Sequence, residues 1–213
     1  MKDLIVVCGG SYGRQLYATV KIINADAEAR GLERPYNVLG FLDDNPHALE
    51  GSEVDLPILG KISDWEPKGS EVYAIGAAFP ETKSKIALML KARGCRFETL
   101  ISPQTIMCDD ITIGEGCYIS AYSVSAGVKL GNFVNINGSM ICPGAEIGDF
   151  STTTGFTVVE KAKVGKRVFL ASHSVICPGV TVGDDVKVAV GSIVTKDVRP
   201  GIMVFGVPAV EIG

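Results

Sequence analysis

Several features are missing from this sequence, and each absence narrows the function. No apolar run approaches the roughly 20 residues that cross a membrane, and LIVVC at 4–8 is too short for the core of a signal peptide. No cluster of lysine and arginine with interleaved aromatics occurs, and the net charge is −4. We therefore expect neither a nucleic-acid partner nor a membrane partner, and a cytoplasmic location.

Histidine is scarce, and cysteine is not paired. The chain has two histidines, His47 and His173, and six cysteines without a CxxC pair. Two histidines cannot build a three-histidine zinc site. Scattered cysteines in a chain without a secretion signal are expected to be reduced and mostly buried. We expect no metal.

The first hundred residues alternate between strand-like and helix-like patterns. Short apolar segments predict strands at 3–8, 37–43, 55–60, 71–76 and 96–101. Apolar residues at helical spacing predict two helices, one carrying Leu16, Val20 and Ile23 and the other carrying Ile86, Met89 and Leu90. This alternation predicts an α/β domain of Rossmann-like type over residues 1–100.

A different period begins after residue 100. An aliphatic residue followed by glycine recurs at steps of 17, 17, 17 and 18 residues, at 113–114, 130–131, 147–148, 164–165 and 182–183. Further aliphatics fall between these pairs, so that an inward residue recurs about every sixth position: Ile119, Val124, Ile136, Ile141, Val158, Leu170, Ile176, Val188 and Val194. Three such residues per coil predict a left-handed parallel β-helix of hexapeptide repeats over residues 101–213.

The tetrapeptide Ile-Cys-Pro-Gly occurs twice in this region, at 141–144 and 176–179. The period predicts that both copies are the same turn, two coils apart, with Val159 stacked between Cys142 and Cys177. Two coils separate these cysteines by roughly 10 Å, beyond the roughly 7 Å limit for a disulfide. Packing is their expected role.

Both halves resemble the bacterial nucleotide-sugar acetyltransferases of the PglD and NeuD kind. The N-terminal segments VVCGGSYGRQ, LGFLDDNP, LPILGK and LISPQTIM and the C-terminal segments GVTVGDD, GSIVTKDVRPG and FGVPA carry the resemblance. It implies acetyl-CoA as co-substrate, a UDP-sugar as small-molecule partner, and a homotrimer with acetyl-CoA between neighbouring β-helices. It also implies acyl-CoA contacts from Thr152, Ser172 and Gly191.

The nucleotide is expected at the glycine-rich turn of the first domain. Gly10, Ser11, Tyr12 and Gly13 lie between a strand and a helix, where backbone N–H groups can bind phosphate. Cys8 occupies the first glycine position of the dinucleotide fingerprint, which argues against NAD. The resemblance places Asp43 and Asp44 near the base and ribose, as a carboxylate at the end of a parallel strand allows; a plain turn is the alternative for both segments.

The general base of the family is missing from this sequence. The family carries its histidine four positions before the Ile-Gly of one coil, and this chain has Pro143 there. Tyr12 and Thr152 occupy the positions of two further family histidines. Three candidates remain for the catalytic machinery: Asn137, Glu160 on the expected neighbouring coil, and His173 in a turn. The alternative for Glu160 is an exposed pair with Lys161 on a turn. The alternative for His173 is a turn residue without a catalytic role.

Two functions stay open. The first is an acetyl-CoA-dependent N-acetyltransferase of a UDP-linked amino sugar, because an amine is partly neutral near pH 7 and depends less on a base than the hydroxyl that an O-acetyltransferase would use. The second is a catalytically silent relative that binds a nucleotide sugar or acyl-CoA. Neither the sugar nor the acyl group follows from the residues.

Overall fold

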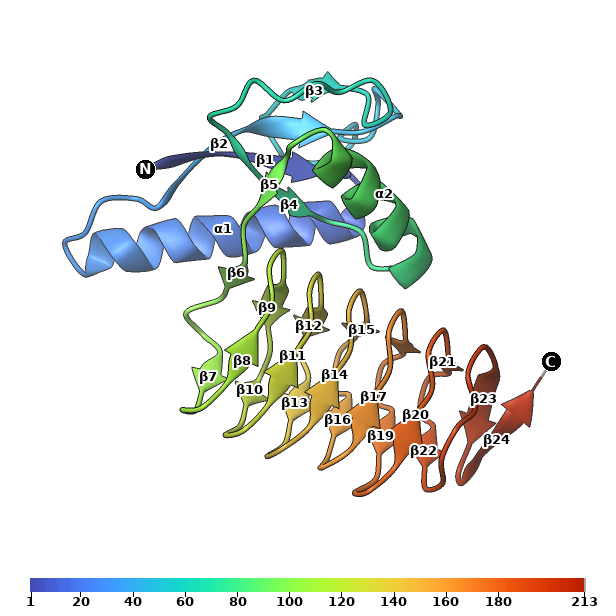
Figure 1. The fold of residues 1–213 in the computed structure, drawn as a ribbon. Helices are drawn as coiled ribbons and strands as arrows, with labels where there is room; N and C mark the ends of the chain where they lie inside the picture. Colours follow the sequence, from blue (N-terminus) through green and yellow to red (C-terminus); the bar gives the residue numbers. More distant parts are fainter. Residues whose placement is uncertain (213) are drawn as a thin grey trace.

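The computed structural model describes residues 1–212 and consists of a small α/β sheet above a long β-helix (Figure 1). The α/β part contains five parallel strands in the order β3-β2-β1-β4-β5. Its elements are β1 (Lys2–Val7), α1 (Ser11–Ala29), β2 (Tyr36–Leu42), β3 (Ile58–Gly60), β4 (Val72–Ile75), α2 (Pro80–Ala92) and β5 (Arg96–Phe97). The five strands and two helices expected from the sequence are present, but no helix separates β2, β3 and β4.

The two helices pack on opposite faces of this sheet. Leu16 and Val20 of α1 join one apolar cluster with Leu4, and Ala87 and Leu90 of α2 join the other cluster with strand residues of the opposite face. Successive strand residues alternate between the two clusters because side chains of a strand point to opposite faces. The sheet is buried on both faces.

The β-helix has three sheets of short, mostly parallel strands, and each of the first five coils contributes one strand to each sheet. The covered sheet contains β6 (Leu100–Ile101), β9 (Tyr118–Ser120), β12 (Asn135–Asn137), β15 (Thr152–Thr153), β18 (Phe169–Leu170), β21 (Lys187–Val188), β23 (Met203–Gly206) and the antiparallel β24 (Ala209–Ile212). The apolar sheet contains β7 (Ile106–Met107), β10 (Ser123–Val124), β13 (Met140–Ile141), β16 (Val158–Val159), β19 (Val175–Ile176) and β22 (Ile193–Val194). The polar sheet contains β8 (Thr112–Ile113), β11 (Lys129–Leu130), β14 (Glu146–Ile147), β17 (Lys163–Val164) and β20 (Thr181–Val182).

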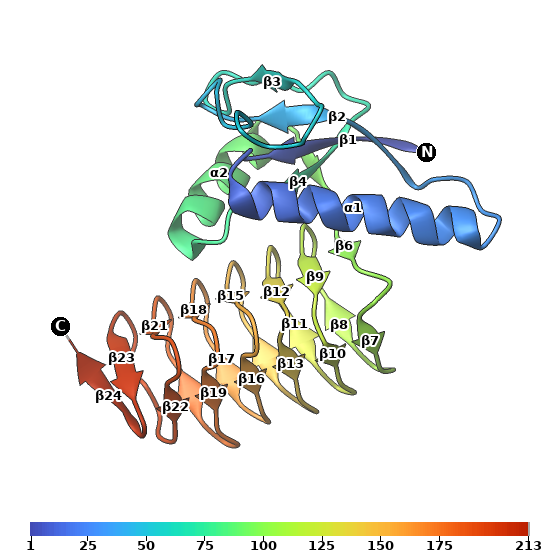
Figure 2. The same cartoon turned by 180° about the vertical axis from the view of Figure 1, so that it is seen from behind.

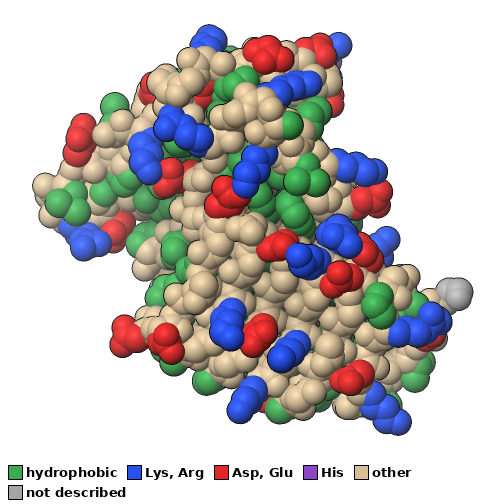
Figure 3. Space-filling view, viewed as in Figure 1, with side chains coloured by type: hydrophobic (Ala, Val, Ile, Leu, Met, Phe, Trp, Pro, Cys, Tyr) green, Lys and Arg blue, Asp and Glu red, His purple; other side chains and the backbone are tan. Residues whose placement is uncertain are grey.

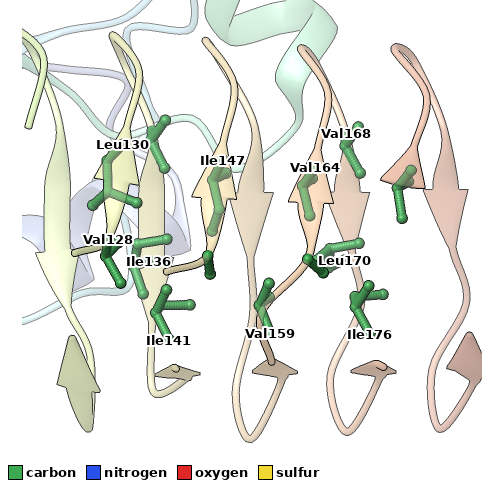
Figure 4. Close-up of a cluster of buried hydrophobic side chains, with 14 of the residues drawn as sticks. Val128, Leu130, Ile136, Ile141, Ile147, Val159, Val164, Val168, Leu170 and Ile176 are labelled. Carbon is green, nitrogen blue, oxygen red and sulfur yellow. The ribbon is translucent and has the colours of Figure 1, made fainter. Parts of the chain in front are cut away.

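Aliphatic side chains fill the axis of the β-helix in ladders (Figure 4). Leu130, Ile147 and Val164 stack on successive coils of the polar sheet, and each is at most 4% exposed. The β-solenoid predicted from the period is thus confirmed. One position of the predicted ladder is wrong: Val158 is half-buried and faces outward, whereas Val159 is fully buried.

An inserted residue explains this shift. Ile136 pairs with Thr153, but Met140 pairs with Val158, so the turn of the later coil is one residue longer. Phe156 lies in this longer turn with a φ of 61°, and its side chain is 73% exposed. The coil spacing is therefore 18 residues on the apolar sheet at this point, although it is 17 on the other two sheets.

The three sheets have different outward surfaces. Helices α1 and α2 rest against the covered sheet (Figure 2). Lys129, Glu146 and Lys163 point outward from the polar sheet, and the face shown in Figure 3 has charged side chains of both signs scattered over it. The outward positions of the apolar sheet are Ile106, Ser123, Met140, Val158, Val175 and Ile193. Among residues 1–212, no helix is long and apolar enough to span a bilayer.

Candidate functional site

The glycine-rich turn connects β1 to the start of α1. Gly10 is the N-cap of α1 and no side chain caps this end, so the first N–H groups of the helix are available to an anion. Ser11 is exposed beside it. Gly13 is buried, and a Cβ there would lie 1.9 Å from the carbonyl oxygen of Cys8. Only glycine lets the helix approach the strand this closely.

Asp43 and Asp44 lie where β2 ends, next to this turn. Asp43 accepts hydrogen bonds from the N–H of Gly9 at 2.7 Å through Oδ2 and from the N–H of Asn45 at 2.9 Å through Oδ1. Asp44 is exposed and accepts from the N–H of Ser63 at 3.2 Å. Burial raises the pKa of the Cys8 thiol to about 12, and the two carboxylates add to this effect. The carboxylates and the turn thus form one polar edge.

A cavity of about 470 Å³ opens beside Asp43. Its walls combine apolar side chains with the charged Glu50 and Lys61, and the remaining lining residues are Pro46, Leu49, Leu56, Ile58 and Gly60. A shallow apolar slot with a carboxylate at its mouth can hold a flat base and accept from its N–H groups or from ribose hydroxyls.

Tyr12 points away from this cavity and toward the β-helix. Its ring meets the ring of Tyr118 edge-on with centroids 5.7 Å apart. Its hydroxyl is buried without a hydrogen-bond partner among the described residues, and burial raises the pKa of this phenol. Tyr12 therefore packs the two parts of the molecule together instead of facing the nucleotide edge.

Thr152 is also an interface residue and not a surface residue. It is fully buried on the covered sheet, and its Oγ1 accepts a hydrogen bond from Nζ of Lys83 at 2.9 Å. Nζ of Lys83 donates as well to the carbonyl oxygen of Ser151 at 3.1 Å. The position expected to contact acyl-CoA is therefore covered by α2 within the chain. The sequence does not predict that Lys83 is buried, because a lysine on the exposed face of a helix fits the same sequence pattern.

A hydrogen bond joins α1 directly to the β-helix. Nε2 of Gln15 donates to Oδ1 of Asn137 at 3.3 Å. Gln15 lies four residues after Ser11 on α1, and Asn137 ends β12. No sequence motif marks Gln15, because only the folded arrangement brings these two residues, 122 positions apart, into contact.

Asn137 is not itself a lining residue of a second cavity, of about 470 Å³, but two of its neighbours are. Its strand neighbour Ser120 and the following Gly138 line that cavity. The other lining residues are Ser102, Gln104, Ala121, Tyr122, Met140, Gly155, Phe156 and Val158, which include no carboxylate and no histidine. The cavity is mostly apolar.

At the corner between the apolar and polar sheets, the residues of successive coils pair differently from the prediction. Ile141 pairs with Val159 and Val159 pairs with Ile176, so Glu160 occupies the corner position between Cys142 and Cys177. The prediction that Val159 stacks between these cysteines, and that Glu160 neighbours Pro143, is wrong by one residue, because of the insertion in the preceding turn. Burial raises the pKa of the Cys142 thiol, and the nearby Glu160 contributes to this.

The remaining predicted residues lie on the corner between the covered and apolar sheets. His173 is exposed with a φ of 61°, and its ring lies over Phe156 at 5.0 Å between centroids. Ser172 shares a hydrogen bond with Thr154 at 3.1 Å. Gly191 is exposed on the next coil, and its N–H donates to the carbonyl oxygen of Ser172 at 3.0 Å.

The structure thus brings some predicted residues together and separates others. Gly10, Ser11, Gly13, Asp43 and Asp44 share one edge. Asn137 lies across the interface from α1, Glu160 and Pro143 lie on another corner, and His173, Ser172 and Gly191 form a third group. Over residues 1–212, no three His, Cys, Asp or Glu side chains are grouped in a way that could hold a metal ion.

Sequence comparison identifies the repeat. Residues 161–196 match the hexapeptide repeat of succinyl-transferases. The chain is 27% identical over 108 residues to the bifunctional protein GlmU of Psychrobacter arcticus, a match that covers 50% of this chain and 24% of GlmU. The chain spans about a quarter or less of the length of the curated relatives it matches.

Structural similarity extends over the whole chain. A single-residue variant of perosamine N-acetyltransferase from Caulobacter crescentus, solved with CoA and GDP-perosamine, has a TM-score of 0.82 at 19% identity and covers 100% of this chain and 98% of its own. The acetyltransferase domain of PglB from Neisseria gonorrhoeae, solved with acetyl coenzyme A, has a TM-score of 0.70 at 21% identity and covers 99% of both chains.

These comparisons indicate the structural class of the chain and, within it, the proteins that it resembles. The repeat and the fold are those of hexapeptide-repeat β-solenoid proteins. Within that class, the chain has the fold of the perosamine N-acetyltransferase and of the PglB acetyltransferase domain, in agreement with the resemblance found in the sequence.

Proposed function

We propose that the protein is an acetyl-CoA-dependent N-acetyltransferase of a nucleotide-linked amino sugar, with UDP as the nucleotide. Residues 1–100 act as a Rossmann-like nucleotide-sugar-binding domain and residues 101–213 as a left-handed β-helix acyltransferase domain. The observation that carries the proposal is the contact between the two: the helix that begins at the free glycine-rich turn touches the β-helix through Gln15 and Asn137.

The nucleotide has a continuous place on the first domain. The base and ribose lie in the cavity at Asp43, and the diphosphate lies against the N–H groups of Gly10 and Ser11. The sugar then extends along α1 toward Asn137. The polar groups at Asp43, Gly10 and Ser11, together with the contact between Gln15 and Asn137, support this order.

The reaction joins the amine nitrogen to the thioester carbonyl carbon and breaks the carbon–sulfur bond. CoA leaves as the thiolate, and the proton released by the new ammonium nitrogen goes to solvent or to this thiolate. The cavity beside Asn137 has no carboxylate or histidine, and Pro143 has neither an N–H nor a basic group. An amine that is already neutral suits such a site, whereas a hydroxyl needs a base. The site therefore favours N-acetylation over O-acetylation.

Acetyl-CoA is the proposed acyl donor. Ser172 is half-buried and Gly191 is exposed on one corner of the β-helix, and the hydroxyl of Ser172 is the group offered to the donor. CoA or acetyl-CoA is bound in the similar structures of the perosamine enzyme and of PglB. Thr152 is left out of this role because Lys83 and α2 cover it.

The apolar sheet supports a homotrimer. Ile106 is 57% exposed and Met140 is 42% exposed on its outward face, and Tyr122 and Phe156 extend the apolar surface at its edge. A run of exposed apolar side chains along one side of a β-helix is a typical contact surface between copies.

Release of the CoA thiol tests the proposed reaction. Purified protein with acetyl-CoA and a UDP-linked 4-amino sugar is expected to release CoA and to form the N-acetylated sugar, detected by mass spectrometry. The GDP- and dTDP-linked amino sugars and the corresponding hydroxy sugars serve as parallel substrates. Turnover of the hydroxy sugars without turnover of the amino sugars would contradict N-acetylation.

A silent binding protein is the second candidate. It is favoured by Pro143, which is exposed at a corner of the β-helix and occupies the position where the resembling family carries its catalytic histidine. Under this alternative, nucleotide sugar or acyl-CoA binds without turnover. Binding of both ligands, combined with CoA release no faster than in buffer, would favour the silent protein over the enzyme.

A further inference from the structure

The hydrogen bond between Gln15 and Asn137 leaves half of each amide unused. Nε2 of Gln15 donates to Oδ1 of Asn137. Among residues 1–212, Oε1 of Gln15 and Nδ2 of Asn137 have no hydrogen-bond partner. Because Gln15 is exposed and Asn137 is half-buried, the free acceptor and the free donor are both accessible to a ligand.

The position of this pair matches the expected course of a nucleotide sugar. Ser11 and Gln15 are four residues apart and share a face of α1, about 6 Å apart along the axis. A sugar attached to a diphosphate at the helix start can reach this distance. Ser120 and Gly138, neighbours of Asn137, line the mostly apolar cavity, which has room for the rest of the acceptor or for the acyl group.

We propose that Gln15 and Asn137 together hold the acceptor amine, and that Gln15 is the residue that positions the amino sugar for acyl transfer. This inference rests on the proposed function. Oε1 of Gln15 accepts a hydrogen bond from the amine, which directs the nitrogen lone pair toward the thioester. Nδ2 of Asn137 donates to the acyl oxygen, on which negative charge develops. The hydrogen bond between the two side chains fixes the orientation of both amides.

The chemistry of this pair sets the expected pH dependence. Neither amide gains or loses a proton in the working range. The acidic limb of log kcat/KM therefore follows the pKa of the substrate amine, which can be titrated separately. A carboxylate in place of the Gln15 amide would stabilise the ammonium form and move this limb to higher pH.

Binding measurements test the subsite without depending on catalysis. The affinities of UDP and of the UDP-linked 4-amino sugar are compared by calorimetry for the native protein, Gln15→Met and the control Lys21→Met on an exposed position of the same helix. The GDP and dTDP pairs are measured alongside. The native protein is expected to bind the amino-sugar nucleotide more tightly than the nucleotide alone. In Gln15→Met, the ratio of the affinity for the amino-sugar nucleotide to the affinity for the nucleotide should fall about 2- to 10-fold, which corresponds to the loss of one hydrogen bond. The affinity for the nucleotide alone should not change. Lys21→Met should behave as native.

Kinetics with Gln15→Glu supplies a second readout. The acidic limb is expected to move to higher pH in this variant, which a merely structural role for Gln15 would not produce. An unchanged sugar contribution in Gln15→Met, or an unmoved limb in Gln15→Glu, overturns the inference. Tight binding of amino-sugar nucleotide without turnover overturns the proposed reaction, and the calorimetric comparison then still decides the role of Gln15. If the native protein binds the amino-sugar nucleotide no more tightly than the nucleotide alone, both the role of Gln15 and the proposed function are overturned.

Discussion

Lys83 is buried in surroundings that a lysine side chain rarely occupies. It is 1% exposed, and its ammonium group meets a carbonyl and a hydroxyl instead of a carboxylate. Burial lowers its pKa well below the ordinary value, and the Cys117 thiol opposes this effect only in part. A buried amine without a counter-charge favours the neutral form, which donates to Thr152 Oγ1 equally well.

This lowered pKa predicts a pH-dependent stability. The folded protein binds the Lys83 proton more weakly than the unfolded chain does, so unfolding takes up a proton at any pH between the lowered pKa and about 10.4. The free energy of unfolding should therefore rise with pH across this window, by up to about 1.4 kcal/mol per pH unit. Lys83→Met should lack this contribution, and chemical denaturation at several pH values between 7 and 9.5 measures it.

Lys85→Met is the control for this measurement, because Lys85 is exposed on the same helix and pairs with Glu81. It should keep the native slope. Equal slopes in the native protein and in Lys83→Met would contradict a lowered pKa of the buried Lys83.

At this scale, the sequence predicts a residue's place only where local chemistry dictates it. The turn of Gly10 and Gly13 follows from its position between a strand and a helix. The burial of Thr152 and the contact of Gln15 with Asn137 depend on how α1 and α2 rest on the β-helix, and no local pattern encodes that packing.

At the scale of elements, the close stacking of coils depends on corners without side chains. A Cβ at Gly148 would lie 2.7 Å from the carbonyl carbon of Gly165, and one at Gly131 would lie 2.5 Å from Oδ1 of Asp149. The recurring glycine thus lets backbones of successive coils approach each other. This requirement also explains why the aliphatic-glycine period predicts the β-helix so well.

Gly148→Ala should destabilise the β-helix by roughly 1–3 kcal/mol, because the new methyl group has backbone atoms as neighbours and these cannot move aside. Gly155→Ala is the matched control, since a Cβ there first meets Ser172 Oγ at 4.0 Å. Its effect should be within about 1 kcal/mol of native and can be stabilising. Urea denaturation of both variants gives the comparison; equal losses would argue against corner packing as the cause.

The element that the sequence predicted least well is the turn that holds Phe156. The step from 147–148 to 164–165 is 17 residues, because an insertion before β16 is offset by a corner one residue shorter between β16 and β17, so the period does not reveal the insertion. The pairing of Met140 with Val158 shows that it lies before β16. That single residue determines whether Glu160 neighbours Cys142 or Pro143, which is why the predicted corner was wrong while the predicted period was right.

At the scale of the whole molecule, the three sheets of the β-helix have three different environments. The covered sheet meets α1 and α2, the polar sheet presents Lys129, Glu146 and Lys163 to solvent, and the apolar sheet has no covering within the chain over residues 1–212. An exposed apolar side chain costs little by itself, but a row of them along one face favours association, since each contact removes apolar surface from water.

This asymmetry gives the prediction for assembly. Met140→Glu places a charge at the centre of the apolar sheet, where burial against another copy would require desolvation without a partner. The variant should remain folded but should dissociate to monomers at concentrations where the native protein is a trimer, as measured by sedimentation. Thr112→Glu adds the same charge on the exposed face of the polar sheet and should leave the assembly intact. Dissociation by Thr112→Glu and not by Met140→Glu would assign the contact to the polar sheet, and a monomeric native protein would remove the trimer from the proposal.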